Sequence, residues 1–347
     1  ASFRMLVNEL RPQDRVAIGV YAGAAGLVLP STAGDEKDTI LSAIEALEAG
    51  GSTAGGEGII LAYKVAGENH IDGGNNRVIL ATDGDFNVGA SSDAAMVRLI
   101  EEKREQGTFL TVLGFGTGNL KDSKMEQLAD HGNGNFAYID NLMEARKVLV
   151  TEIGGTLLTI AKDVKIQVEF NPSRVAAYRL IGYENRLLAN EDFNDDTKDA
   201  GELGAGHSVT ALYEVIPVGV ASAFEIRGVD SLRYQTPGTT TSTSDSPELI
   251  FVKLRYKEPD GETSRLIEQP LLDSPDEPSS DLRFAAAVAG FGMILRESEY
   301  CGAEWSLADV LELARGSTGD DSEGYRAEFI RLVEAANSLE LLAQASY

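Results

Sequence analysis

Two oxygen-bearing side chains, Thr53 and Asp83, have types and a spacing that could build a metal site. Thr53 lies in a glycine-rich turn just before a helical stretch, and Asp83 closely follows the apolar strand segment 77–81. In a sheet covered by helices, such positions fall at the carboxyl ends of strands, where these folds bind ligands. A hydroxyl and a carboxylate that meet there form a hard oxygen site for Mg2+ or Ca2+. Ser52 and Asp85 are weaker candidates, and Asp85 would reach the ion through a water molecule.

The sequence from Gly50 to Asp85 resembles the von Willebrand factor A domain. In that family the metal-ion-dependent adhesion site takes an Asp-x-Ser-x-Ser loop, a Thr from a glycine-rich turn, and an Asp from a Thr-Asp-Gly turn. Thr53 and Asp83 match the last two of these features. The resemblance implies that both side chains are ligands of Mg2+ or Ca2+ in the full-length protein. The alternative is ordinary turn chemistry, in which Thr53 caps a helix and Asp83 begins a turn.

The Asp-x-Ser-x-Ser loop does not occur upstream of Thr53. Residues 1–10 look like the helix that follows this loop in the family. We therefore expect the chain to be part of a longer protein, truncated just after the loop, with the first strand and the other ligands before residue 1. Two ligands alone hold a divalent ion weakly. In this fragment we expect the ion to be absent, or to be held by waters and a neighbouring molecule.

The missing first strand has a structural consequence. Removing a strand from the middle of a parallel sheet exposes unpaired backbone groups and an apolar face. We expect the gap to be filled by a retained upstream peptide, by a strand from a neighbouring molecule in an exchanged homodimer, or by rearranged pairing.

Residues 1–155 alternate between strand and helix patterns, which predicts an α/β fold with a doubly wound, mostly parallel sheet. Strands are expected at 15–21, 26–30, 78–81, 109–115 and 135–139. We expect segment 78–81 at the centre, in the same sheet as 15–21. Segments with helical spacing are 4–10, 35–47, 57–66, 92–106, 125–129 and 142–153.

Residues 156–279 predict an antiparallel, sandwich-like β region, and residues 280–347 a helical region. Segment 164–170 alternates strictly, which indicates a half-buried strand. Further strands are expected at 178–181, 208–216, 231–234, 249–256 and 264–267, and helices at 281–297, 306–314 and 324–343. The segments 171–188 and 191–219 resemble bacterial proteins that join a von Willebrand factor A domain to a C-terminal region of unassigned role. This resemblance covers nearly the whole chain.

The composition restricts the partners. The chain has 55 acidic and 30 basic residues and a net charge of −25, which disfavours nucleic acid and anionic membranes. Its most apolar window, 284–295, is shorter than the ~20 residues that cross a bilayer. The single cysteine, Cys301, excludes an internal disulfide. Because family members typically have a secretion or lipoprotein signal, we expect the full-length protein in the periplasm or cell envelope.

Other motifs give weaker signals. Segment 114–118 follows a strand but lacks the GxGxxG spacing, which favours a glycine turn over a nucleotide site. Segment 192–196 begins like a calcium loop, but Thr197 and Leu203 replace the expected Gly and Glu, so a solvated acidic loop is expected. His131 is expected in a surface turn, and Cys301 as a packed or half-buried thiol. Nothing indicates a catalytic nucleophile.

Three functions remain open. The first is a non-catalytic, metal-dependent protein-binding module for adhesion or assembly, in which an acidic residue of a protein partner completes the coordination of the ion. The second is a Mg2+-dependent hydrolase that uses the same sheet edge. The third is a structural scaffold domain that binds no metal.

Overall fold

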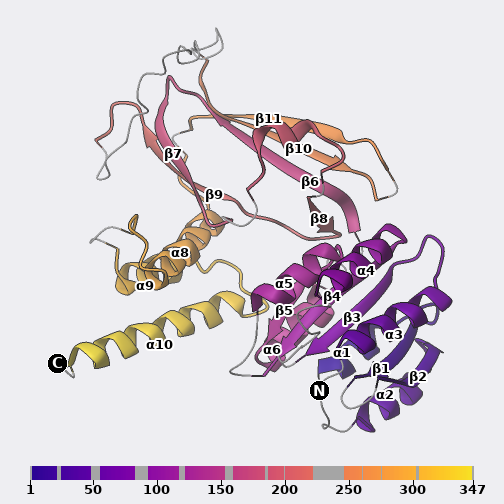
Figure 1. The fold of residues 1–347 in the computed structure, drawn as a ribbon. Helices are drawn as coiled ribbons and strands as arrows, with labels where there is room; N and C mark the ends of the chain where they lie inside the picture. The colour runs from indigo at the N-terminus through magenta and orange to yellow at the C-terminus, as the bar shows by residue number, and fades with distance from the viewer. Residues whose placement is uncertain are drawn as a thin grey trace. The chain divides into compact units, whose positions relative to one another are not determined.

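The computed structural model describes residues 2–21, 25–47, 55–82, 93–116, 122–152, 159–183, 187–198, 200–221, 246–259, 261–274, 276–301 and 305–345. These residues form two compact units, drawn as ribbons in Figure 1. The first unit contains 1–166, 189–209 and 254–267, and the second contains 167–188, 210–253 and 268–347. The boundaries predicted at 155 and 279 stay a prediction.

The N-terminal part has the expected α/β class. Its parallel sheet has the order β3-β4-β5, formed by β3 (Asn76–Thr82), β4 (Thr108–Phe115) and β5 (Phe136–Ile139). Most residues of β4 are buried, as expected for a parallel strand covered on both faces. The helices are α1 (Ser2–Glu9), α2 (Lys37–Glu45), α3 (Gly55–Glu68), α4 (Asp93–Glu105), α5 (Asp122–His131) and α6 (Leu142–Arg146), which continues as the π-helical turn η1 (Lys147–Thr151).

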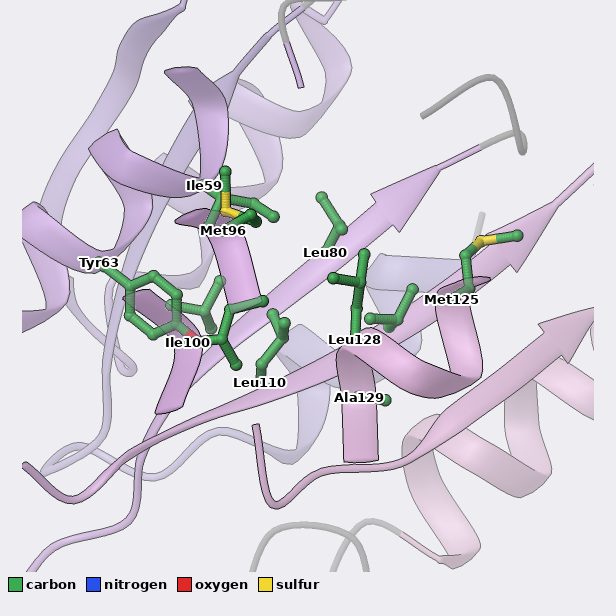
Figure 2. Close-up of a cluster of buried hydrophobic side chains, with 11 residues drawn as sticks. Ile59, Tyr63, Leu80, Met96, Ile100, Leu110, Met125, Leu128 and Ala129 are labelled. Atoms are coloured by element: carbon green, nitrogen blue, oxygen red, sulfur yellow. The ribbon is translucent and has the colours of Figure 1, made fainter. Parts of the chain in front are cut away.

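Helices cover this sheet on both faces. Figure 2 shows the larger core, in which α3, α4 and α5 pack on β3 and β4. It contains Ile59, Tyr63, Val78, Leu80, Met96, Ile100, Leu110, Val112, Met125, Leu128 and Ala129. A second core is formed by other side chains of the same strands, in which Ile79 of β3 and Leu113 of β4 pack against α1, α6 and η1. Two separate cores on one sheet confirm the doubly wound arrangement.

The expected place of segment 15–21 is wrong. β1 (Arg15–Val20) pairs antiparallel with β2 (Gly26–Ala33) in a two-stranded sheet of its own, and β3 is at an edge of its sheet. The physical reason is that no strand lies between β1 and β3 in the described residues, so backbone pairing cannot join them. The small sheet has a separate core with α1 and α2, centred on Val7, Leu29 and Ile40.

The β region has two sheets. One has the order β11-β10-β6-β8, and the other joins β7 to β9 in an antiparallel pair. The strands are β6 (Thr159–Phe170), β7 (Val175–Ile181), β8 (Gly201–Gly204), β9 (Leu212–Pro217), β10 (Glu248–Lys257) and β11 (Arg265–Leu272). The predicted strand 231–234 lies outside the described residues.

The expected alternation along β6 fails at one point. Lys165 is buried and Ile166 is exposed, which reverses the predicted inward and outward positions. Lys165 is turned inward, where its ammonium group donates to the backbone carbonyls of Asp192 and Asp195. The pairing of β6 with β8 is irregular on both sides of Ala161, and Asp163 has a φ of 51°.

The C-terminal region is helical, as predicted. It contains α8 (Ser280–Leu295), α9 (Leu307–Arg315) and α10 (Tyr325–Ala345). The three helices share one core, in which Ala287, Val310, Ala314 and Val333 are fully buried. Ser306 begins α9 with a capping box, because its side chain accepts from the backbone N–H of Asp309 while the Asp309 carboxylate accepts from the N–H of Ser306.

Candidate metal centre

Helix α3, which follows the predicted ligand Thr53, packs against strand β3, which precedes the predicted ligand Asp83. Helix α3 begins at Gly55, two residues after Thr53, and strand β3 ends at Thr82, directly before Asp83. Ile59 and Tyr63 of α3 lie in the same core as Val78 and Leu80 of β3 (Figure 2). Ser52, Thr53, Asp83 and Asp85 themselves lie outside the described residues. Their assignment as ligands therefore stays a prediction.

A tyrosine that sequence analysis missed links these two elements. The hydroxyl of Tyr21, just after β1, donates to the backbone carbonyl of Ala81 in β3 at 2.5 Å. The same side chain lies against α3, since a Cβ placed on Gly58 would be 2.5 Å from the Cβ of Tyr21. Tyr21 therefore contacts β3 near its carboxyl end and α3 in its first turn. The apolar pattern of segment 15–21 identified a strand but could not reveal this contact.

Tyr21 contacts elements that are adjacent in sequence to the predicted ligands. It contacts both the carboxyl end of β3 and the start of α3. Asp83 directly follows β3 in the sequence, and Thr53 lies two residues before α3. Hydroxyl and carboxylate oxygens are the donors that Mg2+ and Ca2+ prefer. In the described part of the chain, no three His, Cys, Asp or Glu side chains form a group that could hold a metal ion.

The end of strand β4 has the expected glycine turn. Gly116 has a φ of 91°, a backbone conformation that glycine adopts without strain. Its carbonyl accepts a hydrogen bond from the hydroxyl of Tyr138 in β5 at 2.5 Å. The rest of the motif, Thr117 and Gly118, lies outside the described residues. The described part favours a structural turn at this position.

Lysine side chains bind the backbone of the acidic loop at 192–196 from the inner side, while none of the side chains of Asp192, Asp195 and Asp196 is buried. The buried ammonium group of Lys165 donates to the backbone carbonyls of Asp192 and Asp195, at 3.1 and 2.5 Å. Lys257, also buried, donates to the carbonyl of Asp196 at 2.7 Å. In a calcium loop, backbone oxygens of this kind would face the ion. Here the ammonium groups of Lys165 and Lys257 bind them instead.

Two carboxylates of this loop accept hydrogen bonds that lower their pKa values. Hydrogen bonds from the Thr197 hydroxyl and backbone lower the pKa of Asp195. Hydrogen bonding from Ser264 lowers the pKa of Asp196, whose Oδ2 accepts from the Ser264 N–H at 3.2 Å. Both groups therefore stay charged while their oxygens hold the local backbone.

The remaining reactive side chains have structural contacts. His131 is the last residue of α5, not part of a turn, and its Nδ1 lies 3.0 Å from the Glu101 carboxylate. The side chain of Asn76 holds the turn after His70 through hydrogen bonds to the backbone of Ile71. Cys301 is a half-buried free thiol, as expected.

The fold and the flanking geometry define a protein with a von Willebrand factor A domain, and residues 3–151 match the family model described as von Willebrand factor type A domain. Residues 155–339 match the model described as Uncharacterized protein YfbK, C-terminal. The chain belongs to this YfbK family, with the A domain preceding the C-terminal region.

One curated relative is similar along nearly the whole chain. It is the Uncharacterized protein YfbK of Escherichia coli (strain K12), 45% identical over 344 residues. The match covers 99% of this chain and 59% of the relative. The chain therefore spans about three fifths of the length of that relative.

Three solved structures show more distant similarity. A von Willebrand factor type A protein from Catenulispora acidiphila has a TM-score of 0.45 at 14% identity, covering 96% of this chain and 76% of its own. The BatB protein from Bacteroides thetaiotaomicron has a TM-score of 0.38 at 24% identity, covering 44% and 83%. Proximal thread matrix protein 1 from the mussel byssus has a TM-score of 0.33 at 22% identity, covering 44% and 40%.

No helix within the described ranges is both long and apolar enough to cross a membrane.

Proposed function

We propose that this chain is the metal-dependent protein-binding part of a longer bacterial protein, and that it is not an enzyme. Thr53 and Asp83 bind Mg2+ or Ca2+ in the full-length protein, with Ser52 as a weaker alternative to Thr53 and with Asp85 at the rim of the site. The observation that supports this most is the contact of Tyr21 with both Ala81 of β3 and Gly58 of α3. It joins the two elements from which the ligands extend.

The partner in this proposal is a protein that offers an Asp or Glu to the ion. An ion held by oxygen ligands from one side keeps an open coordination position, which a carboxylate of the partner completes. The net charge of −25 supports a protein partner over nucleic acid or an anionic membrane, both of which the chain would repel. The C-terminal region would then act as scaffold or effector for the binding domain.

We place the full-length protein in the periplasm or cell envelope. This proposal comes from the family resemblance, since its members typically have a secretion or lipoprotein signal. Fractionation of cells that produce the full-length protein tests it directly. Recovery of the protein only in the cytoplasmic fraction would contradict it.

Two alternatives use the same fold. A scaffold domain that binds no metal would keep its partners in EDTA. A Mg2+-dependent hydrolase would turn over phosphate or ester substrates, and a substrate screen of the purified full-length protein would detect it. Metal dependence of partner binding separates the first alternative from our proposal, and turnover separates the second.

The experiment compares cells that produce the full-length protein with cells that produce the Asp83→Ala variant. Chemical cross-linking followed by mass spectrometry identifies partners in the presence of Mg2+ or EDTA. We expect a partner that is captured by the wild type in Mg2+ and lost in EDTA and in Asp83→Ala. Asp72→Ala is a matched control, because Asp72 is fully exposed in the turn that precedes β3. A partner captured equally in all conditions favours the scaffold.

A further inference from the structure

We propose that Met293 is an oxidisable contact, and that its conversion to the sulfoxide tightens the joint between the β7–β9 pair and helix α8. This joint consists of Arg179, Glu214, Met293 and Tyr300, all of which lie in the second unit. The proposal goes beyond the proposed function and does not depend on it, because no predicted metal ligand takes part.

Arg179 is the centre of the joint. On β7 it lies directly opposite Glu214 of β9, and its Nε donates to Oε2 of this glutamate at 2.6 Å. Its Nη2 donates to the sulfur of Met293, near the end of α8, at 3.4 Å. The guanidinium carbon lies 4.3 Å from the centre of the Tyr300 ring, in the turn after α8. One side chain of the strand pair therefore binds two residues of the helical region.

The hydrogen bond to Met293 is weaker than the one to Glu214. A thioether sulfur is a poor acceptor, whereas the arginine side chain has five N–H donors and is always charged. Oxidation adds a polar oxygen to the sulfur. Because an N–H of Arg179 already donates to this sulfur, the new oxygen would accept a charge-assisted hydrogen bond, which is about twice as strong as one between neutral groups.

The reaction needs a hydroperoxide, of which hydrogen peroxide is the simplest. A lone pair of the Met293 sulfur forms a bond to one peroxide oxygen, the O–O bond breaks, and the leaving hydroxide takes the proton from the sulfur-bound oxygen to give water. The sulfur loses two electrons and the peroxide gains them. Methionine sulfoxide reductases reverse the change, so the joint can be switched in both directions.

Met293 is accessible enough to react. It is half-buried on α8, and the Arg179 side chain beside it is 24% exposed. Met96 and Met125 are buried in the core of the first unit, at 5% and 1% exposure. An oxidant in solution therefore reaches Met293 before these two.

Two other methionines provide matched controls. Met5 is half-buried on α1, and Met143 is 40% exposed on α6. Within the described residues, neither of these sulfurs accepts a hydrogen bond. Their oxidation adds a polar oxygen without a cationic partner, and such oxidation usually disrupts packing. The joint predicts the opposite effect for Met293.

The test combines peroxide treatment of this chain with peptide mass spectrometry and hydrogen exchange. Mass spectrometry reports which methionines carry an added oxygen, and exchange reports the order of backbone amides at 175–181 and 288–295. We expect oxidation to slow exchange in both segments by about tenfold, the factor for one hydrogen bond to a charged group. Reduction by methionine sulfoxide reductases should restore the original rates.

Two variants separate the joint from general effects of oxidation. Met293→Leu keeps the volume of the side chain and removes the sulfur, so peroxide should leave exchange in both segments unchanged although Met5 and Met143 still react. Arg179→Leu removes the cation, so oxidation of Met293 should speed exchange in the same segments.

Three results would overturn the proposal. They are faster or unchanged exchange in the oxidised wild type, equal slowing in oxidised Met293→Leu, and no oxygen on Met293 under conditions that fully oxidise Met143. Because the comparison of the wild type with Met293→Leu is decisive by itself, an Arg179→Leu variant that failed to fold would not obscure it. None of these results involves Mg2+, so failure of this proposal leaves the proposed function to its own test.

Discussion

The ammonium nitrogen of Lys257 lies 2.6 Å from Oδ2 of Asp163, and the two side chains are only 7% and 14% exposed. Burial by itself lowers the pKa of Lys257, but the hydrogen bond and negative charge of Asp163 outweigh burial and raise this pKa. The other oxygen of Asp163 accepts from the backbone N–H of Ala200 at 3.2 Å. The pair therefore joins β10 and β6 to the backbone just before β8.

Removing one member of this pair should destabilise the β region strongly. Lys257→Met leaves the Asp163 carboxylate buried without its cation, which costs about 3 kcal/mol or more. The matched control is Lys162→Met in β6, the strand that contains Asp163, because Lys162 pairs at 3.8 Å with the exposed Glu262. Such exposed pairs contribute less than about 1 kcal/mol. Urea unfolding of the two variants should differ accordingly, and equal stabilities would show that the buried pair contributes little.

The capping box of α9 predicts a pH-dependent stability. A hydrogen bond with Ser306 lowers the pKa of Asp309, so the folded state binds a proton there less readily than the unfolded chain. The stabilisation is therefore complete above the ordinary pKa of about 4 and is lost as the pH falls through the lowered value. We expect faster hydrogen exchange in α9 of Asp309→Asn than of the wild type at pH 7.

This difference should shrink as the wild-type carboxyl becomes protonated in acid. Ser306→Ala, which removes the other half of the box, should cost about 1 kcal/mol. Neutral Thr318, whose hydroxyl lies near the last carbonyls of α9, provides a control, since Thr318→Ala should not change the pH dependence. A difference between Asp309→Asn and the wild type that is constant with pH would contradict the assignment.

The separation of β1 from β3 predicts an unusual solution state. Within the described residues each of these strands has a neighbouring strand on one side only, while α1 contributes Leu6 to one core and Val7 to the other. We expect this gap to be filled by a retained upstream peptide, by a strand of a second copy, or by rearranged pairing. In the first two cases, size-exclusion chromatography with light scattering and intact mass should show an additional peptide or a dimer. A stable monomer of this chain with an open gap in its sheet and no added mass would contradict the expectation.

The order of helices and strands was predictable because each element has its own local spacing of hydrophobic residues in the sequence. Strand β4 and helix α9, for example, lie within two residues of their predicted positions. The pairing of β1 was not predictable from the same spacing. Sheet membership depends on which strand is available as a neighbour, and that is a nonlocal property.

The missed features of the site have the same origin. Lys165 is buried because its ammonium group binds the backbone carbonyls of Asp192 and Asp195, which are 27 and 30 residues away, and no alternation pattern signals such a contact. Tyr21 and Ala81 are 60 residues apart, and no local pattern signals their hydrogen bond. The predicted metal ligands were inferred from a short motif and a family resemblance, and their positions lie outside the described residues.

Calorimetric titration of the full-length protein with Mg2+ tests the metal-dependent function most directly. We predict saturable binding at one site in the wild type and in the exposed control Asp72→Ala. Asp83→Ala should weaken this binding by more than the ~10–100-fold that the loss of an outer partner costs a metal site, while far-UV circular dichroism stays unchanged. Equal Mg2+ affinity of Asp83→Ala and the wild type, or no binding by the wild type, would contradict the proposed function.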